Sequence, residues 1–85
     1  MESWRLYWHV TETRERCEVV GVGVARPGQE IPTGAMEMRC SGGKEESIWL
    51  YRAVRTRLTG RHLTSVEETS RAIRSLLGEL QPSGQ

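Results

Sequence analysis

The chain opens with stretches in which apolar and polar residues alternate, which is the period-two pattern of a half-buried β-strand. In residues 4–10, tryptophan, leucine and valine alternate with arginine, tyrosine and histidine. Residues 17–26 are rich in valine and predict a second strand, and residues 35–40 alternate again and predict a third. The segments between them, 11–16 and 26–34, are charged or rich in glycine and proline and predict turns or loops.

The length of the first turn decides which side chains of the opening hairpin share a face. An odd-length turn gathers seven large apolar side chains on one face, and a shift of one residue separates them. We therefore predict an odd-length turn. The seven side chains are those of Trp4, Leu6, Trp8, Val10, Val20, Val22 and Val24. The opposite face is then polar and smooth, with Arg5, Tyr7, His9, Gly21 and Gly23.

Residues 45–58 fit two structures. As a helix, they place Leu50, Val54 and Leu58 on one face, with glutamates first and arginines last, as the helix dipole favours. As a strand, they have high β-propensity, and residues 41–44 would form the preceding hairpin turn. We favour the helix.

The last segment predicts a helix with a defined start. Ser65 and Glu68 have the spacing of a capping box, in which each side chain satisfies a backbone amide at the helix start. An apolar stripe follows, formed by Val66, Ile73, Leu76, Leu77 and Leu80. Residues 81–85 have the composition of a disordered tail.

These elements predict one α+β domain over residues 1–80 of the 85-residue chain. We expect a three-stranded antiparallel β-meander followed by two α-helices packed on one face of the sheet. The alternative, in which residues 45–58 are extended, is four strands and one C-terminal helix.

Composition narrows the chemistry. The formal charge is +1, so the whole chain has no strong field to attract nucleic acid or membrane. All eleven acidic residues are glutamate and asparagine is absent, which excludes phosphoryl-transfer sites of the usual Asp/Asn type. The two cysteines, Cys17 and Cys40, can form a disulfide only if their strands pair. Because residues 1–8 lack the pattern of a secretory signal and no apolar run is long enough for a membrane span, we expect a cytoplasmic protein with reduced thiols.

No pattern supports a metal, a cofactor or a catalytic set. The potential zinc ligands, His9, Cys17, Cys40 and His62, include no pair at the close spacing of structural zinc sites. Cys17 and His9 would share a sheet face in the predicted register, but no third group is marked to orient them as a nucleophile pair. The glycines at 21 and 23 lie inside a predicted strand, where their amides form hydrogen bonds within the sheet and are not available to bind a phosphate. We therefore expect no enzyme activity.

One cluster has the composition of a binding surface, because it combines aromatic side chains with arginines. Its members are Trp49, Tyr51, Arg52, Arg55, Arg57 and Arg61. We expect a small non-enzymatic binding module that acts on another protein as a regulator, adaptor or inhibitor. A homodimer is also expected, because a small sheet has free edges that recruit strands. The alternative is nucleic-acid binding, with the arginines on phosphates and an aromatic ring on a base.

Overall fold

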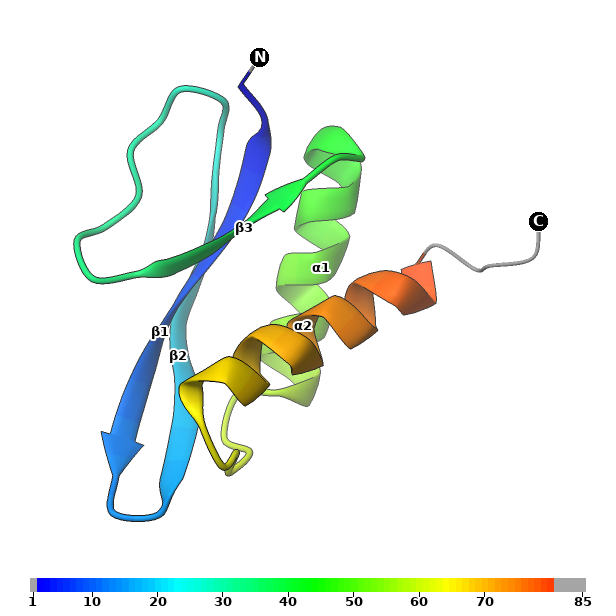
Figure 1. Cartoon of the computed structure of the whole chain (residues 1–85). Helices are drawn as coiled ribbons and strands as arrows, with labels where there is room; N and C mark the ends of the chain where they lie inside the picture. Colours follow the sequence, from blue (N-terminus) through cyan, green and yellow to red (C-terminus); the bar gives the residue numbers. More distant parts are fainter. Residues whose placement is uncertain (1, 81–85) are drawn as a thin grey trace.

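The computed structural model describes residues 2–80 and contains three strands and two helices. They are β1 (Trp4–Thr13), β2 (Arg16–Ala25), β3 (Met36–Cys40), α1 (Gly43–Arg57) and α2 (Val66–Leu80). The strands form one antiparallel sheet, and both helices lie on the same face of it (Figure 1). The predicted α+β class is confirmed, and the four-strand alternative is wrong because residues 45–57 are helical. The predicted disordered tail at 81–85 lies outside the described residues.

The order of the strands is β2-β1-β3, so the first strand is central and the order differs from that of a sequential meander. The strands β2 and β3 run in the same direction on the two sides of β1 and do not pair. Their connection crosses the side of the sheet opposite the helices (Figure 1), and Arg5 Nη2 anchors it by donating to the carbonyl of Arg26 at 2.8 Å. Cys17 and Cys40 are therefore separated by β1, and both thiols are free.

The turn of the first hairpin has two residues, because Thr13 pairs with Arg16. Next to this turn the predicted odd-length register is wrong. His9 lies opposite Val20, which places Val20 on the polar face, and Val19 is the fully buried residue. A one-residue change of register exchanges the faces of a strand in this way.

Further along the hairpin, a β-bulge restores the predicted faces. The register shifts between Tyr7 and His9, where β2 contains the extra residue. Gly21 lies at this point with φ of +57°, a left-handed conformation that glycine adopts without a steric penalty. Beyond the bulge, Leu6 lies opposite Val24, so these two residues share a face as predicted.

The core lies between the sheet and the two helices. Trp8 is 1% exposed, and its indole Nε1 donates to the Thr69 hydroxyl of α2 at 3.2 Å, so the buried N–H group is satisfied. The apolar stripe predicted for α1 is confirmed, because Leu50, Val54 and Leu58 are all buried. The fully buried side chains also include Leu6, Val19 and Ile73.

Near each helix start, a side chain accepts a hydrogen bond from a backbone amide. The Gly42 amide before α1 donates to Glu46 Oε1 at 2.8 Å. The amide of Glu68 donates to Ser65 Oγ at 3.1 Å, as the predicted capping box requires. The carboxylate of Glu68 accepts a hydrogen bond from the Thr64 amide at 3.0 Å, one residue before the position that the motif predicts.

The two edges of the sheet differ. The loop between the helices pairs with the edge of β2 through two hydrogen bonds, Cys17 N to Leu63 O at 2.7 Å and Leu63 N to Cys17 O at 2.9 Å. The outer edge of β3 has no backbone hydrogen bond to any other segment of residues 2–80. One edge is therefore partly closed, and the other is open.

Candidate functional site

The six residues of the predicted binding cluster fall into three groups around α1. The first group lies along one side of α1. There Trp49, Arg52 and Arg57 line a shallow hollow of about 260 Å³ together with Ala53 and Thr56. Trp49 is half-buried against the core, while the two arginines are exposed. This group combines an aromatic side chain with cations on one surface of a single helix.

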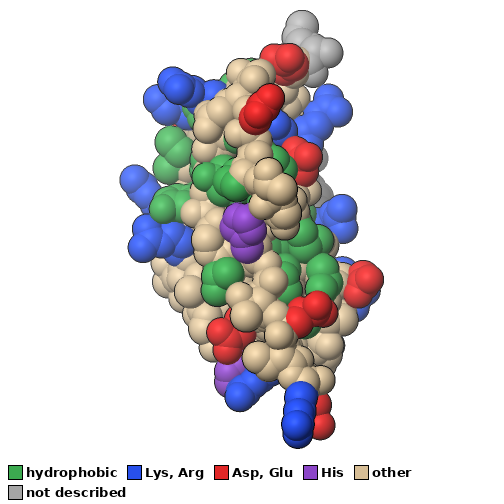
Figure 2. Space-filling view, turned by 90° about the vertical axis from the view of Figure 1, so that its left-hand side faces the viewer, with side chains coloured by type: hydrophobic (Ala, Val, Ile, Leu, Met, Phe, Trp, Pro, Cys, Tyr) green, Lys and Arg blue, Asp and Glu red, His purple; other side chains and the backbone are tan. Residues whose placement is uncertain are grey.

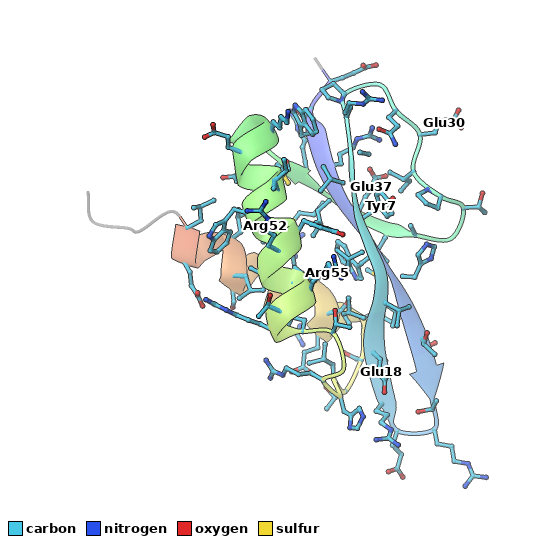
Figure 3. All side chains as sticks on the ribbon, turned by 180° about the vertical axis from the view of Figure 1, so that it is seen from behind. Tyr7, Glu18, Glu30, Glu37, Arg52 and Arg55 are labelled. Carbon is cyan, nitrogen blue, oxygen red and sulfur yellow. The ribbon has the colours of Figure 1, made fainter. Side chains whose placement is uncertain are left out.

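The second group is on the flank of α1 that leads from Arg52 toward β2. Arg55 Nη1 donates to the Tyr51 hydroxyl at 3.0 Å, and its guanidinium carbon lies 5.5 Å from the centre of the tyrosine ring. This cation–π geometry holds the arginine against the ring. Arg52 and Arg55 both lie on the side of α1 turned toward the viewer in Figure 3.

The third group is Arg57 with Arg61, and Arg57 links it to the first group because it lines the hollow at Trp49 and also the one at Arg61. Arg57 Nη1 forms an ion pair with Glu79 Oε1 of α2, so its charge is neutralised within the fold. Arg61 lies beyond the end of α1 and lines a separate hollow between the helices, with Leu58, Ala72 and Leu76. Arg52 links two pairs of side chains, because it lines one hollow with Trp49 and another with Arg55, which contacts Tyr51. Arg57 also lines the hollow at Trp49, but its charge is paired with Glu79, and Arg61 shares a hollow only with Arg57 among the other five residues.

We call Trp49, Tyr51, Arg52 and Arg55 the α1 outer surface. Within the described part of the chain, neither Arg52 nor Arg55 has a carboxylate within 4.0 Å. Arg52 makes no hydrogen bond to another residue there, and the only side-chain partner of Arg55 is the neutral tyrosine. The surface thus presents two cations that no acidic group of residues 2–80 compensates.

A further hollow was not anticipated from the sequence. It has a volume of about 700 Å³ and lies between the tip of the first hairpin and the loop after α1. In it the guanidinium of Arg16 lies 2.9 Å from His62 Nδ1, and His62 Nε2 lies 3.3 Å from Glu18 Oε2. The pairing of Leu63 with β2 brings these segments together, and no local sequence pattern marks that contact. In this cluster His62 lies between an arginine and a glutamate, and Arg16 contacts the imidazole ring and has no carboxylate within 4.0 Å among residues 2–80.

The sheet face opposite the helices is mixed in character. Figure 2 turns this side toward the viewer and shows basic, acidic, histidine and apolar side chains next to one another. The ring of Tyr7 lies over Gly23, since a Cβ atom at residue 23 would be 2.3 Å from Tyr7 Cζ. His9 lies close to Gly21 in the same way. The glycines therefore accommodate aromatic rings of the neighbouring strand.

The cysteines and histidines do not assemble into a reactive or metal-binding group. Cys17 is buried on the helix side of the sheet, and His9 lies on the opposite face, so the shared face predicted for them is wrong. Burial raises the pKa of the Cys17 thiol, and the nearby carboxylate of Glu12 raises it further. Burial also raises the pKa of Cys40. Among residues 2–80, no three His, Cys, Asp or Glu side chains are grouped as metal ligands.

Comparison with other proteins adds no assignment. No family model, curated protein or solved structure matches this chain. Within residues 2–80, neither helix is long and apolar enough to cross a membrane. A proposal for function therefore depends on the geometry and charge of the α1 outer surface.

Proposed function

We propose that the chain is a small, non-enzymatic binding module that acts on another protein as a regulator, adaptor or inhibitor. The α1 outer surface is its contact site, and the partner presents acidic side chains. The observation that carries the proposal is the pair of uncompensated arginines, Arg52 and Arg55, beside Trp49 and Tyr51. Tryptophan, tyrosine and arginine are the residues most enriched at the energetic centres of protein interfaces.

The arrangement of the surface supports this use in two ways. Trp49 and Tyr51 are half-buried, so a partner covers rings that the fold already holds in place and loses little side-chain entropy. Arginine is weakly hydrated and binds carboxylates with two parallel hydrogen bonds, which favours an acidic protein surface.

Nucleic-acid binding through the same arginines is the alternative. The distribution of charge favours a protein partner, because Arg57 is neutralised by Glu79 and Arg61 lies in a different hollow. Two uncompensated arginines neutralise few phosphates, and affinity for nucleic acid depends on the number of phosphates neutralised.

The test is affinity capture of partners from the native host, followed by mass spectrometry, with three forms of the protein. The wild type and the Arg74→Glu control, which changes an exposed arginine of α2, should retain the same acidic protein. The Arg52→Glu/Arg55→Glu variant should lose it, with an affinity at least about tenfold weaker, equivalent to about 1.4 kcal/mol.

Nucleic acid is tested in parallel by titrating generic single- and double-stranded DNA and RNA at increasing salt. Phosphate-driven binding weakens steeply with salt. Steep, salt-sensitive binding that is lost in Arg52→Glu/Arg55→Glu would replace the protein-partner proposal. Equal capture by all three forms would remove the α1 outer surface from consideration.

A further inference from the structure

The open edge of the sheet belongs to β3. All five residues of β3 pair with β1, from Trp4 opposite Cys40 to Trp8 opposite Met36, with no change of register. The strand contains no proline, and no backbone hydrogen bond from another segment of residues 2–80 reaches its outer edge. The edge of β2, in contrast, is interrupted by the bulge at Gly21 and by its pairing with the loop after α1. Strand addition is therefore favoured at β3.

The side chains of β3 alternate strictly between the two faces. Met38 and Cys40 are buried on the helix side, with Met36 half-buried beside them. Glu37 and Arg39 point to the other face and are exposed. The strand thus has one acidic and one basic residue placed symmetrically about Met38.

We propose that β3 pairs antiparallel with β3 of a second copy of this chain, with the two Met38 residues on the two-fold axis. In this arrangement Glu37 of each chain lies directly opposite Arg39 of the other, which makes two cross-strand ion pairs. Met36 lies opposite Cys40 of the second copy, so the apolar layer continues across the junction. The two three-stranded sheets become one six-stranded sheet.

The charges select this register and disfavour its neighbours. A shift of two residues in either direction places Glu37 opposite Glu37 or Arg39 opposite Arg39, and like charges directly opposite each other are destabilising. A shift of one residue brings methionines opposite charged residues and mixes the faces. The symmetric placement of Glu37 and Arg39 about Met38 is complementary to itself, so it favours β3 of a second copy over a strand of arbitrary sequence.

The isolated chain also leaves a charge on β3 poorly compensated. Arg39 lies directly opposite Arg5 of β1, and its only side-chain hydrogen bond in residues 2–80 is to the neutral Ser3 Oγ, at 3.2 Å. Glu37 lies 3.8 Å from Arg5 Nη1 and remains 52% exposed (Figure 3). The second copy would place a carboxylate beside Arg39, where the chain itself places another arginine.

The proposed pairing does not depend on the function proposed for the α1 outer surface. That surface is formed by residues of α1, and no residue of β3 lines either of its hollows. A strand of five residues makes a small interface, and small interfaces are weak and transient. The dimer should therefore dissociate on dilution and be detected at high protein concentration.

The experiment measures the molar mass of the full chain by sedimentation velocity from micromolar to millimolar concentration. The wild type and the Glu30→Arg control, which makes the same charge change in the loop before β3, should dimerise equally. Glu37→Arg and Arg39→Glu should each weaken the dimer by about tenfold or more, because the symmetry converts two attractive pairs into two repulsive ones. Circular dichroism checks that each exposed substitution leaves the fold intact.

Two combinations of these substitutions make the test specific. Glu37→Arg mixed with Arg39→Glu should form a heterodimer, since each arginine then lies opposite a glutamate. The double variant Glu37→Arg/Arg39→Glu should recover the homodimer. A wild type that stays monomeric at every concentration would overturn the proposal and leave the edge to a strand of another protein. A dimer that persists unchanged in Glu37→Arg, or a mixture that does not associate, would overturn it as well.

Discussion

The contact between Tyr7 and Gly23 predicts that the substitution Gly23→Ala destabilises the protein when Tyr7 is present and stabilises it when the tyrosine ring is absent. A Cβ atom at residue 23 would lie 2.3 Å from Cζ and from the hydroxyl oxygen of Tyr7, whereas ordinary contacts begin at 3.4 Å. The change Gly23→Ala therefore forces the tyrosine ring off the sheet. Residue 23 is not among the glycines with positive φ, so its backbone accepts alanine without strain.

Two opposing contributions set the magnitude. Replacing glycine by alanine within a strand stabilises the folded state by about 0.5–1 kcal/mol, because the unfolded chain loses conformational freedom. Overfilling a packed contact costs about 1–3 kcal/mol. The Tyr7 ring is only half-buried and is free to swing aside, so the cost lies toward the low end of that range. We expect Gly23→Ala to lower the free energy of unfolding by about 1 kcal/mol, or the melting temperature by about 4–8 °C.

The control is the same substitution without the ring. In a Tyr7→Ala background, Gly23→Ala should raise the free energy of unfolding by about 0.5 kcal/mol, because only the backbone contribution remains. Urea unfolding followed by tryptophan fluorescence measures all four proteins of this double-mutant cycle. If Gly23→Ala stabilises the protein with Tyr7 present, or if the two effects simply add, the ring does not lie where we place it.

Three further predictions concern the core, the second helix and the thiols. Thr69→Val should lower the free energy of unfolding by about 1–3 kcal/mol, because it leaves the buried indole N–H of Trp8 without an acceptor; a smaller loss in a Trp8→Phe background checks the cause. Hydrogen bonds from Thr64 hold the pKa of Glu68 below its usual range. Its carboxylate therefore stabilises the fold at pH values above the ordinary pKa of glutamate, and this contribution is lost as the pH falls through the lowered pKa. In Glu68→Gln, the free energy of unfolding should depend less on pH in the acid range. Burial raises the pKa of both cysteine thiols, so iodoacetamide at neutral pH should modify them slowly in the folded protein and rapidly in urea, and equal rates would contradict their burial.

The parts of the fold that the sequence predicts are those encoded by neighbours along the chain. The spacing of Leu50, Val54 and Leu58 distinguishes helix from strand because it reports one face of a single element. Ser65 and Glu68 mark the start of α2 for the same reason, since their hydrogen bonds are made within one helical turn.

The parts that the sequence does not predict depend on contacts between distant segments. The valines of β2 appear equivalent in the sequence, but the two-residue turn places Val20 on the polar face, and the bulge at Gly21 returns Val24 to the helix side. Nothing in the residues 26–35 themselves indicates that their path takes β3 past β2 to the free side of β1. That path becomes clear only with the anchor that Arg5 provides.

The candidate binding cluster also depends on contacts between segments that are distant in the sequence. Composition groups its aromatic and basic residues, because they lie close together along the chain. The structure pairs the charge of Arg57 with Glu79, which lies 22 residues away and reaches it only after α2 packs against α1. A pattern read along one helix cannot show which of its charges a second helix neutralises.

The unequal edges of the sheet limit how far the chain can polymerise. Growth of a β-sheet from chain to chain needs a recruiting strand on both flanks, as in fibres built from head-to-tail contacts. Here the bulge at Gly21 and the bridge between Cys17 and Leu63 interrupt the edge of β2, so two chains joined through β3 have no uninterrupted edge left. The proposed pairing through β3 would therefore end at a dimer, because no second open edge is left to recruit a third chain.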